Sequence, residues 1–265
     1  MTARKQYIHF SFDDVYECLK DITEQAGVYR SIFENDFFAW LKRMHETYGV
    51  VFSLYTFNYF SKDPNYDISN LPNNYADELA TNSDWLKFGF HSKDDLKKYT
   101  EDEPENIKAD YQKFLDAIMH ATNQNEHSID RVVRLGFCAG SRENILALRD
   151  LKNGIRGLLA ADDGRLLYYF GEDETKSLIE HGELRNEEII YLRSQTRIEY
   201  LNSIEEILKS VCSYTDPKVI ELFSHEIFWN LNSKMEGYSI RQICEYIIKW
   251  ASENNYSFGF AQDLY

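Results

Sequence analysis

The stretch HFSFDDV, residues His9–Val15, sets the pattern on which the rest of the chain is built. An aromatic, apolar segment runs straight into two adjacent carboxylates, Asp13 and Asp14. Two neighbouring ionised Asp side chains repel each other, and a strand that only had to end would more easily use Gly, Asn or a single Asp. The pair is therefore either an ordinary solvated turn or the rim of a site that requires negative charge.

Strand-like and helix-like segments alternate along the whole chain of 265 residues. We predict strands at 7–12, 49–57, 85–90, 131–137, 154–160, 218–225 and 256–261, and helices at 15–25, 35–48, 105–121, 141–151, 203–210 and 239–254. This alternation indicates parallel βα units with right-handed crossovers, in an open sheet or a barrel. About seven strands, with no GxGxxG or GxxxxGK[ST] after the first, favour a barrel over a nucleotide-binding sheet.

The chain reads as one domain, residues 1–265, without internal repeats or a flexible linker. Segments 165–170 and 187–201 look like strands outside the main pattern and predict a hairpin insertion near 163–200. The segment 56–75 is a long polar loop rich in aromatic residues, whose role the sequence leaves open.

Composition excludes several functional classes. The net charge of -15 argues against binding to nucleic acid or to an anionic membrane surface. The four cysteines lack CxxC spacing, so they read as reduced thiols rather than as a zinc knot or a disulfide framework. Neither a signal peptide nor an apolar run of transmembrane length is recognisable, and we expect a cytoplasmic protein.

Polar residues gather where the predicted strands end. Asp13 and Asp14 follow the first strand, His91 ends the third, Arg134 lies in the fourth and His225 ends a late one. The fifth strand leads to the pair at 162 and 163. In α/β barrels the chemistry lies at the C-terminal ends of the strands, so acids, histidines and an arginine would converge on one rim.

The segment HSKDD, residues 91–95, allows two interpretations. It could be an ordinary helix start, capped by Ser92 or Asp94, in which the carboxylates suit the N-terminal dipole. Alternatively, if a helix begins there, His91 and Asp95 lie four residues apart on one face, and both can reach one cation.

Four segments together resemble the motifs of the polysaccharide deacetylases of the NodB-homology type, carbohydrate esterase family 4. SFDDV (11–15) resembles the family's TFDDG, HSKDD (91–95) its His-Ser/Thr-x-x-His, RLG (134–136) its Arg-x-Pro, and LFSH (222–225) its Leu-x-His. Val15 replaces a Gly, Asp95 replaces the second His, and the third motif lacks its proline. The resemblance implies a distorted (β/α)7 TIM-like barrel.

The resemblance also implies a role for each motif residue. Asp14, His91 and Asp95 would hold a divalent metal, Zn²⁺ first, with Co²⁺, Mn²⁺ or Fe²⁺ as alternatives, and leave one position for water. The metal would polarise an acyl carbonyl and acidify the water. Asp13 would take the proton from that water, with Arg134 pairing with Asp13 to keep it ionised and oriented. His225 would protonate the departing amine or alcohol.

Three functions remain open. The first is a metal-dependent hydrolase that removes an acetyl group from an N- or O-acetylated carbohydrate. The second is a non-catalytic relative that binds a glycan or a partner protein. The third is a metal-free glycoside hydrolase, in which Asp13 or Asp14 and Glu226 would lie about 5–10 Å apart across a cleft.

Overall fold

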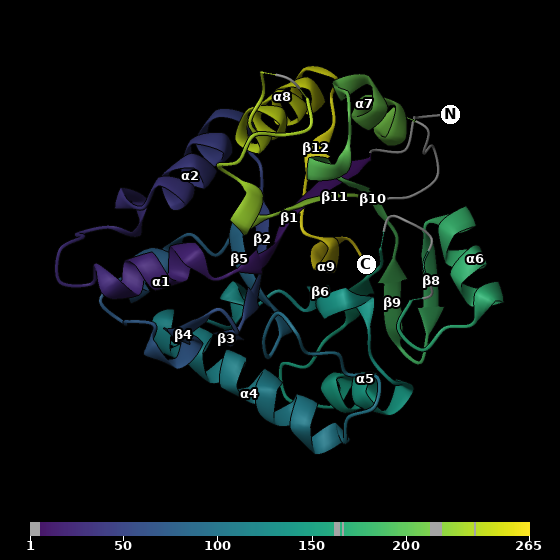
Figure 1. Cartoon of the computed structure of the whole chain (residues 1–265), viewed down its shortest axis with the longest axis horizontal. Coiled ribbons are helices and arrows are strands. Elements are labelled where there is room, and N and C mark those ends of the chain that lie inside the picture. Colours follow the sequence, from purple (N-terminus) through teal and green to yellow (C-terminus); the bar gives the residue numbers. More distant parts are fainter. Residues whose placement is uncertain (1–5, 162–164, 166, 213–218, 236) are drawn as a thin grey trace.

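We describe the protein from a computed structural model, in which residues 6–161, 165, 167–212, 219–235 and 237–265 are described (Figure 1). The main sheet is parallel and has the strand order β10-β11-β1-β2-β5, with the short β12 also paired to β1. Its strands are β1 (Tyr7–Val15), β2 (Phe52–Phe57), β5 (Leu86–Ser92), β10 (Ser194–Arg197), β11 (Val219–His225) and β12 (Ser257–Phe258). The N-terminal β1 therefore lies in the middle of the sheet.

A second sheet has the order β6-β7-β9-β8, in which only β8 runs antiparallel to its neighbour. Its strands are β6 (Val132–Val133), β7 (Gly157–Leu159), β8 (Glu183–Asn186) and β9 (Ile189–Leu192). Only Arg193 separates β9 from β10, so one stretch of chain pairs with β7 in this sheet and with β11 in the main sheet. On the other side, a single parallel bridge, Phe88 to Ile129, lies between β5 and β6.

The prediction of an α/β fold built on parallel strands is confirmed. Closure into a (β/α)7 barrel is not seen as a continuous ladder among the described residues, because the pairing between β5 and β6 is reduced to that one bridge. The expected hairpin corresponds to β8 and β9, joined by two residues with positive φ, Glu187 and Glu188. The predicted strand at 165–170 is wrong in its described residues, where 168 and 169 form a turn.

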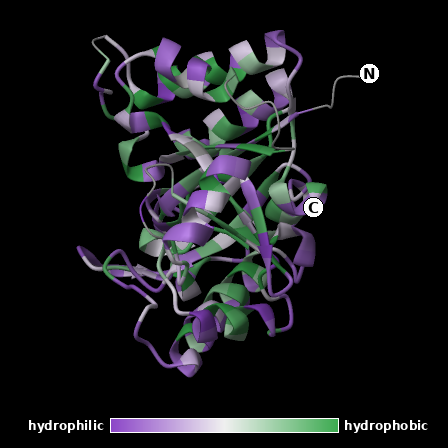
Figure 2. Ribbon diagram, turned by 90° about the vertical axis from the view of Figure 1, so that its right-hand side faces the viewer, coloured by the Kyte–Doolittle hydropathy of each residue, from purple (hydrophilic) through white to green (hydrophobic). Residues whose placement is uncertain are grey.

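Helices surround the strands, and hydrophilic and hydrophobic residues are mixed along their ribbons (Figure 2). They are α1 (Glu17–Glu24), α2 (Asp36–Tyr48), α3 (Ala76–Thr81), α4 (Pro104–Ala121), α5 (Arg142–Arg149), α6 (Glu172–His181), α7 (Ile204–Cys212), α8 (Ile240–Glu253) and α9 (Ala261–Leu264). The predicted loop at 56–75 instead contains a small hairpin, β3 (Tyr59–Phe60) with β4 (Asp63–Asp67). No helix in the described part of the chain has the length and apolar character needed to cross a bilayer.

Local chemistry fixes the ends of the longer helices. The side chain of Asn35 accepts hydrogen bonds from the first amides of α2, and Gly49, with φ 72°, ends that helix in the left-handed conformation. Ser239 and Gln242 form a reciprocal capping box at the start of α8. These residues explain why α2 begins and ends, and α8 begins, close to the predicted bounds.

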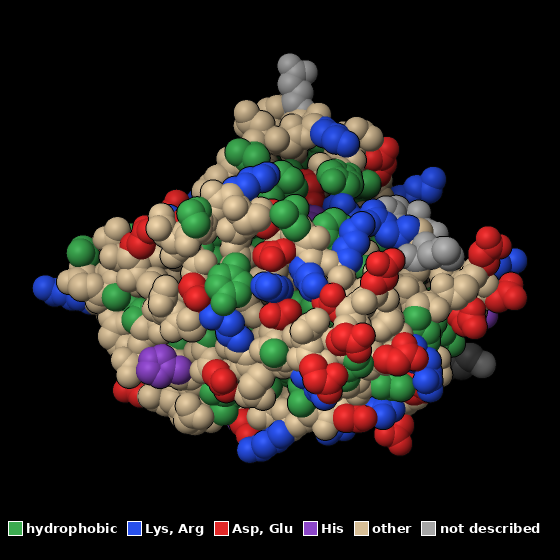
Figure 3. Space-filling view, turned by 60° about the horizontal axis from the view of Figure 1, so that its bottom comes forward, with side chains coloured by type: hydrophobic (Ala, Val, Ile, Leu, Met, Phe, Trp, Pro, Cys, Tyr) green, Lys and Arg blue, Asp and Glu red, His purple; other side chains and the backbone are tan. Residues whose placement is uncertain are grey.

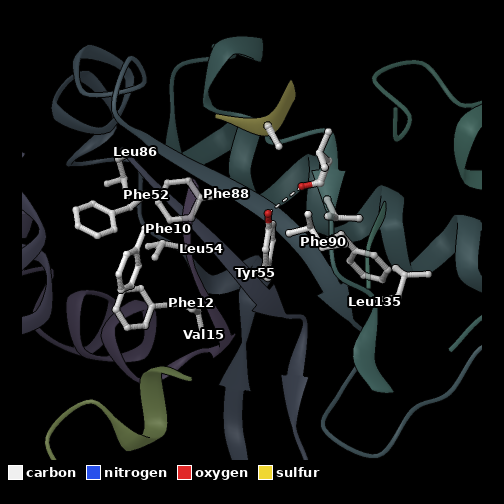
Figure 4. Packing of buried hydrophobic residues seen from close by; sticks show 14 of the residues in the cluster. Phe10, Phe12, Val15, Phe52, Leu54, Tyr55, Leu86, Phe88, Phe90 and Leu135 are labelled. Atoms are coloured by element: carbon white, nitrogen blue, oxygen red, sulfur yellow. Dashed lines mark hydrogen bonds between the residues drawn. The ribbon is translucent and has the colours of Figure 1, made fainter. Parts of the chain in front are cut away.

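The two faces of β1 differ in character. Phe10 and Phe12 point outward and pack against Phe52 of β2, in the cluster of apolar side chains seen in Figure 4. Phe12 and Phe52 also contact the ring of Trp40 in α2. The alternate residues His9, Ser11 and Asp13 are also buried, but on the opposite face. The space enclosed by the strands is therefore lined by polar groups, in contrast to the branched apolar residues that usually fill a barrel.

Candidate active site

A cavity of about 280 Å³ opens at the C-terminal ends of the strands. All the sequence-predicted site residues line it: Asp13, Asp14, His91, Asp95, Arg134 and His225. A position at the cavity wall does not by itself show that these side chains bind one ligand together. The hydrogen-bond and ion-pair partners of each side chain determine its chemical role.

A β-bulge separates the two adjacent aspartates. Phe12 pairs with Leu54, but the next pair is Val15 with Thr56, so β1 contains one residue more than β2 over this stretch. Asp14 takes up the extra length with φ 56°, a left-handed conformation that Asp tolerates better than most residues. As a result, Asp13 is buried, whereas the side chain of Asp14 is 24% exposed. The bulge lets neighbouring carboxylates have different partners.

Asp13 is held by a fully buried arginine. Arg134 Nη1 donates to Asp13 Oδ1 at 2.6 Å, while Nη2 donates to Glu221 Oε1 at 3.0 Å and to Ser194 Oγ at 2.8 Å. The guanidinium also lies 3.9 Å from the ring centroid of Phe223. The structure thus brings together the Asp13–Arg134 pair expected from the resemblance, and it adds Glu221 as a second carboxylate on the same cation.

Below this pair, a polar network continues through the interior. His9 Nδ1 lies 2.5 Å from Glu221 Oε2, and His9 Nε2 lies 2.8 Å from Ser53 Oγ, which donates to Asp130. Burial alone would lower the pKa of His9, but the nearby Glu221 and Asp130 outweigh it and raise that pKa. Burial would likewise raise the pKa of Glu221, but His9 and Arg134 together lower it. The interior therefore contains acidic and basic side chains in alternation from Asp13 down to Asp130.

Asp14 faces two histidines. Its Oδ1 lies 3.3 Å from His91 Nε2, and its Oδ2 lies 3.9 Å from His225 Nε2. Although burial opposes the shift, the hydrogen bond with His91 and the charges of His91, His225 and Arg197 lower the pKa of Asp14. His91 Nδ1 lies 2.5 Å from the carbonyl oxygen of Arg134 and can only donate to it, which leaves Nε2 directed at the cavity.

His225 is held by a carboxylate that the sequence analysis missed. Its Nδ1 bonds to Glu199 Oε1, and Ser224 Oγ donates to Glu199 Oε2 at 2.9 Å. Burial lowers the pKa of His225, but Glu199, Asp13 and Asp14 outweigh it and raise that pKa. Glu199 lies in a single 3-10 turn, Ile198–Tyr200, directly after β10. Glu199 lies near the end of the strand-like segment 187–201, and strand ends are where the other site residues were predicted. It was missed because that segment was interpreted as an insertion outside the main pattern.

Asp95 does not join Asp14 and His91. No helix forms at 92–96, so the condition that would have put His91 and Asp95 on one helical face is not met. Both carboxylate oxygens of Asp95 are used by Ser61, from its amide at 2.8 Å and from its hydroxyl at 2.7 Å. Among the residues that the structure describes, no three His, Cys, Asp or Glu side chains are grouped to hold a metal ion.

Two further expectations are resolved by position. Glu226 is buried and accepts hydrogen bonds from the amides of Tyr16, Glu17 and Cys18, at 2.7, 2.9 and 2.6 Å, so it caps α1 and does not line the cavity. This does not support its role as the second carboxylate of a glycoside hydrolase. The pair at 162 and 163 lies outside the described residues.

No family model and no curated protein matches the sequence. Solved structures do. A family 4 acetyl xylan esterase from Clostridium thermocellum, in complex with a cobalt ion, has 10% identity and a TM-score of 0.53, covering 98% of this chain and 90% of its own. The chain has the fold of a family 4 carbohydrate esterase. A peptidoglycan N-acetylglucosamine deacetylase is similar in the same way, with 9% identity, a TM-score of 0.52 and coverage of 99% and 89%.

A third structure with the esterase fold, a deacetylase with substrate, has 11% identity and a TM-score of 0.50, covering 98% of this chain and 90% of its own. The resemblance inferred from the four motifs is thereby confirmed at the level of the fold. The donor set, in contrast, supplies one protein ligand fewer than a catalytic zinc site, which uses three. Asp14 and His91 supply two, while Asp95 is held by Ser61.

Proposed function

We propose that this chain is a hydrolase that removes an acyl group, acetyl in the first place, from an N- or O-acylated carbohydrate. One observation carries the proposal: two acid–base groups, each held by a different charged partner, face one cavity from neighbouring strands. Asp13 of β1 is opposite His225 of β11 in the sheet register, and the first is bound to Arg134 and the second to Glu199. The family 4 esterase fold supports the choice of substrate class.

Asp13 suits the role of general base. Its carboxylate is kept in one orientation by Arg134. The guanidinium of Arg134 is itself fixed by hydrogen bonds to Glu221 and Ser194, so it stays in place when a substrate binds. In the proposed reaction, Asp13 accepts a proton from water as the water oxygen bonds to the acyl carbon. A base held at a fixed position lowers the entropy cost of reaching the reactive geometry.

His225 suits the role of general acid. Glu199 binds Nδ1, which leaves Nε2 on the cavity side, and the raised pKa keeps the ring protonated at a higher pH than an ordinary histidine. When the bond from the acyl carbon to nitrogen or oxygen breaks, His225 gives its proton to the departing amine or alcohol, and the acid is released. Glu199 acts as a positioning residue, because it touches His225 rather than the reacting atoms.

A divalent metal, Zn²⁺ with Co²⁺, Mn²⁺ and Fe²⁺ as alternatives, belongs to the proposal as a separate part. Asp14 and His91 are the two side chains that would bind it, and none of the steps above depends on it. Metal analysis of the purified protein tests this part, with Asp14→Ala and His91→Ala as the variants that would lose the ion. A metal-free wild type that is folded and active would contradict it.

Release of acetate from acetylated xylo-oligosaccharides and from N-acetylglucosamine oligomers tests the hydrolase itself. We expect release by the wild type, and a loss of about 10²–10⁴-fold in Asp13→Asn and in His225→Ala, the range for a single acid–base group. Asn is close to Asp in shape, so Asp13→Asn separates chemistry from packing. Release that is unchanged in both variants would refute the assignment.

A second function, glycan binding without catalysis, is favoured by the Asp95–Ser61 contact, which leaves the implied ligand set incomplete. It predicts that the wild type binds an acetylated oligosaccharide, that the affinity survives Asp13→Asn and His225→Ala, and that no acetate appears. Calorimetry on the same variants and substrates therefore distinguishes the two functions.

A further inference from the structure

A second cavity, of about 380 Å³, lies at the opposite end of β6, β7 and β9 from the candidate active site. Arg131 directly precedes β6 and Arg156 directly precedes β7, whereas Arg134 follows β6 and lines the active-site cavity. Arg185, from β8, completes a set of three arginines. The other wall comes from the C-terminal segment, since α9 lies beside β6 (Figure 1) and Gln262 accepts a hydrogen bond from the amide of Arg131 at 2.7 Å.

None of the three arginines has a carboxylate oxygen within 4.0 Å among the described residues. Arg131 Nε donates to the carbonyl oxygen of Gly154 at 2.7 Å, and the Arg185 guanidinium lies 5.7 Å from the ring centroid of Tyr265. Burial, and then the positive charge of the nearby Arg156, lower the pKa of Arg131. The cavity therefore holds positive charges that no carboxylate of the described residues neutralises by direct contact.

This is unusual in a chain in which 44 Asp and Glu outnumber 29 Lys and Arg. Several arginines elsewhere are paired: Arg43 with Glu245, Arg142 with Glu187 and Arg149 with Asp150. On the face shown in Figure 3, acidic and basic side chains are likewise interspersed. Three arginines without ion pairs around one cavity need a different explanation from general surface charge.

Two carboxylates complete the lining. Glu188 and Asp263 face the cavity but form no ion pair with its arginines. Guanidinium groups offer planar pairs of N–H donors that match the oxygens of a phosphate group. Carboxylates accept hydrogen bonds from hydroxyls, as a sugar would offer. The lining thus suits a ligand that carries both an anionic group and hydroxyl groups.

We propose that this cavity binds a phosphate group, either free phosphate or the phosphate of a phosphorylated sugar. Arg156 and Arg185, which are both exposed, would contact the phosphate together with Arg131. A volume of about 380 Å³ exceeds what free phosphate needs and lies in the range of small-molecule sites. The site is separate from the candidate active site, so it does not depend on the proposed hydrolase activity.

Calorimetry and thermal unfolding of the whole protein test the proposal, with inorganic phosphate, glucose 6-phosphate and glucose as probes at constant ionic strength. We expect saturable binding and a rise in Tm with both phosphates, and neither effect with glucose. Arg156→Gln and Arg185→Gln should each weaken binding about tenfold, the effect of losing one charge-assisted hydrogen bond. Arg30→Gln, at an exposed arginine outside the cavity, is the matched control and should bind as the wild type does.

The two phosphate sources give different results. Glucose 6-phosphate binding more tightly than phosphate identifies a sugar ester, and equal affinities identify the phosphate group alone. Far-UV circular dichroism and the urea midpoint confirm that each variant is folded. The proposal is overturned if phosphate has no effect beyond that of chloride at equal ionic strength, or if folded Arg156→Gln and Arg185→Gln bind as tightly as Arg30→Gln.

Discussion

Replacing Arg134 by Met would leave a carboxylate without its cation in the interior of the fold. Arg134 is 3% exposed and forms ion pairs at 2.6 Å with Asp13 and at 3.0 Å with Glu221. Glu221 would keep His9 as a partner, so Asp13 is the group that loses the one ion pair it forms within the described part of the chain. Removing one member of a buried pair costs about 3–5 kcal/mol. A domain of this kind is stable by about 5–15 kcal/mol, so the loss is large enough to measure.

Urea unfolding followed by circular dichroism gives the free energy of unfolding for each variant. If the uncompensated charge causes the loss, Arg134→Met combined with Asp13→Asn should recover about half of it, because the second change removes that charge. Arg142→Met is the matched control, since the Arg142–Glu187 pair is partly exposed and should change stability little. The reasoning is refuted if Arg134→Met is no more destabilised than Arg142→Met, or if the double variant recovers nothing.

Three further predictions concern the interior and the cap of α1. Because the folded pKa of His9 is raised and that of Glu221 is lowered, their pairing should stabilise the protein most between those two pKa values. The free energy of unfolding should fall as pH rises through the folded pKa of His9, by at most about 1.4 kcal/mol per pH unit for one proton. Urea titrations across pH should show this slope in the wild type and not in His9→Gln. Gly89→Ala should lower the free energy of unfolding by about 1–3 kcal/mol in the same assay, because a Cβ atom there would lie 2.5 Å from the ring of Tyr55. The hydroxyl of Tyr55 donates to the Val132 carbonyl oxygen (dashed in Figure 4), which holds the ring in place. A change within experimental error would show that the ring can move. Glu226→Ala should cost about 1–3 kcal/mol and speed hydrogen exchange of the three amides it caps, and unchanged exchange would mean that water replaces the cap.

The parts of the site that sequence could predict are those carried by strand ends. Asp13, His91 and His225 lie at or within two residues of the C-terminal end of a strand whose apolar run is visible in the sequence, and parallel strands bring such ends to one edge. Asp95 could not be predicted in the same way, because its partner depends on whether a helix forms after β5 and on a serine from the β3–β4 hairpin. Its position four residues after His91 was informative only under the helical assumption.

Short strands limited the prediction of the second sheet. The predicted strands 131–137 and 154–160 do contain β6 and β7, but these have only two and three residues, too few for periodicity to fix their bounds. The helix Glu172–His181 was not predicted, and the segment 187–201 read as an insertion although it contains β9, β10 and Glu199. Tertiary pairing, rather than local sequence, decides that this stretch belongs to both sheets.

The central position of β1 has a consequence for how the protein is made. Tyr7 pairs with Val219, so the strand that carries both aspartates completes its hydrogen bonding only after more than two hundred further residues have left the ribosome. Until then, the edge of β1 that β11 will cover is available to other chains, and its aromatic side chains favour association. Nascent chains that stop short of β11 should therefore be recognised by chaperones, while the completed chain should not.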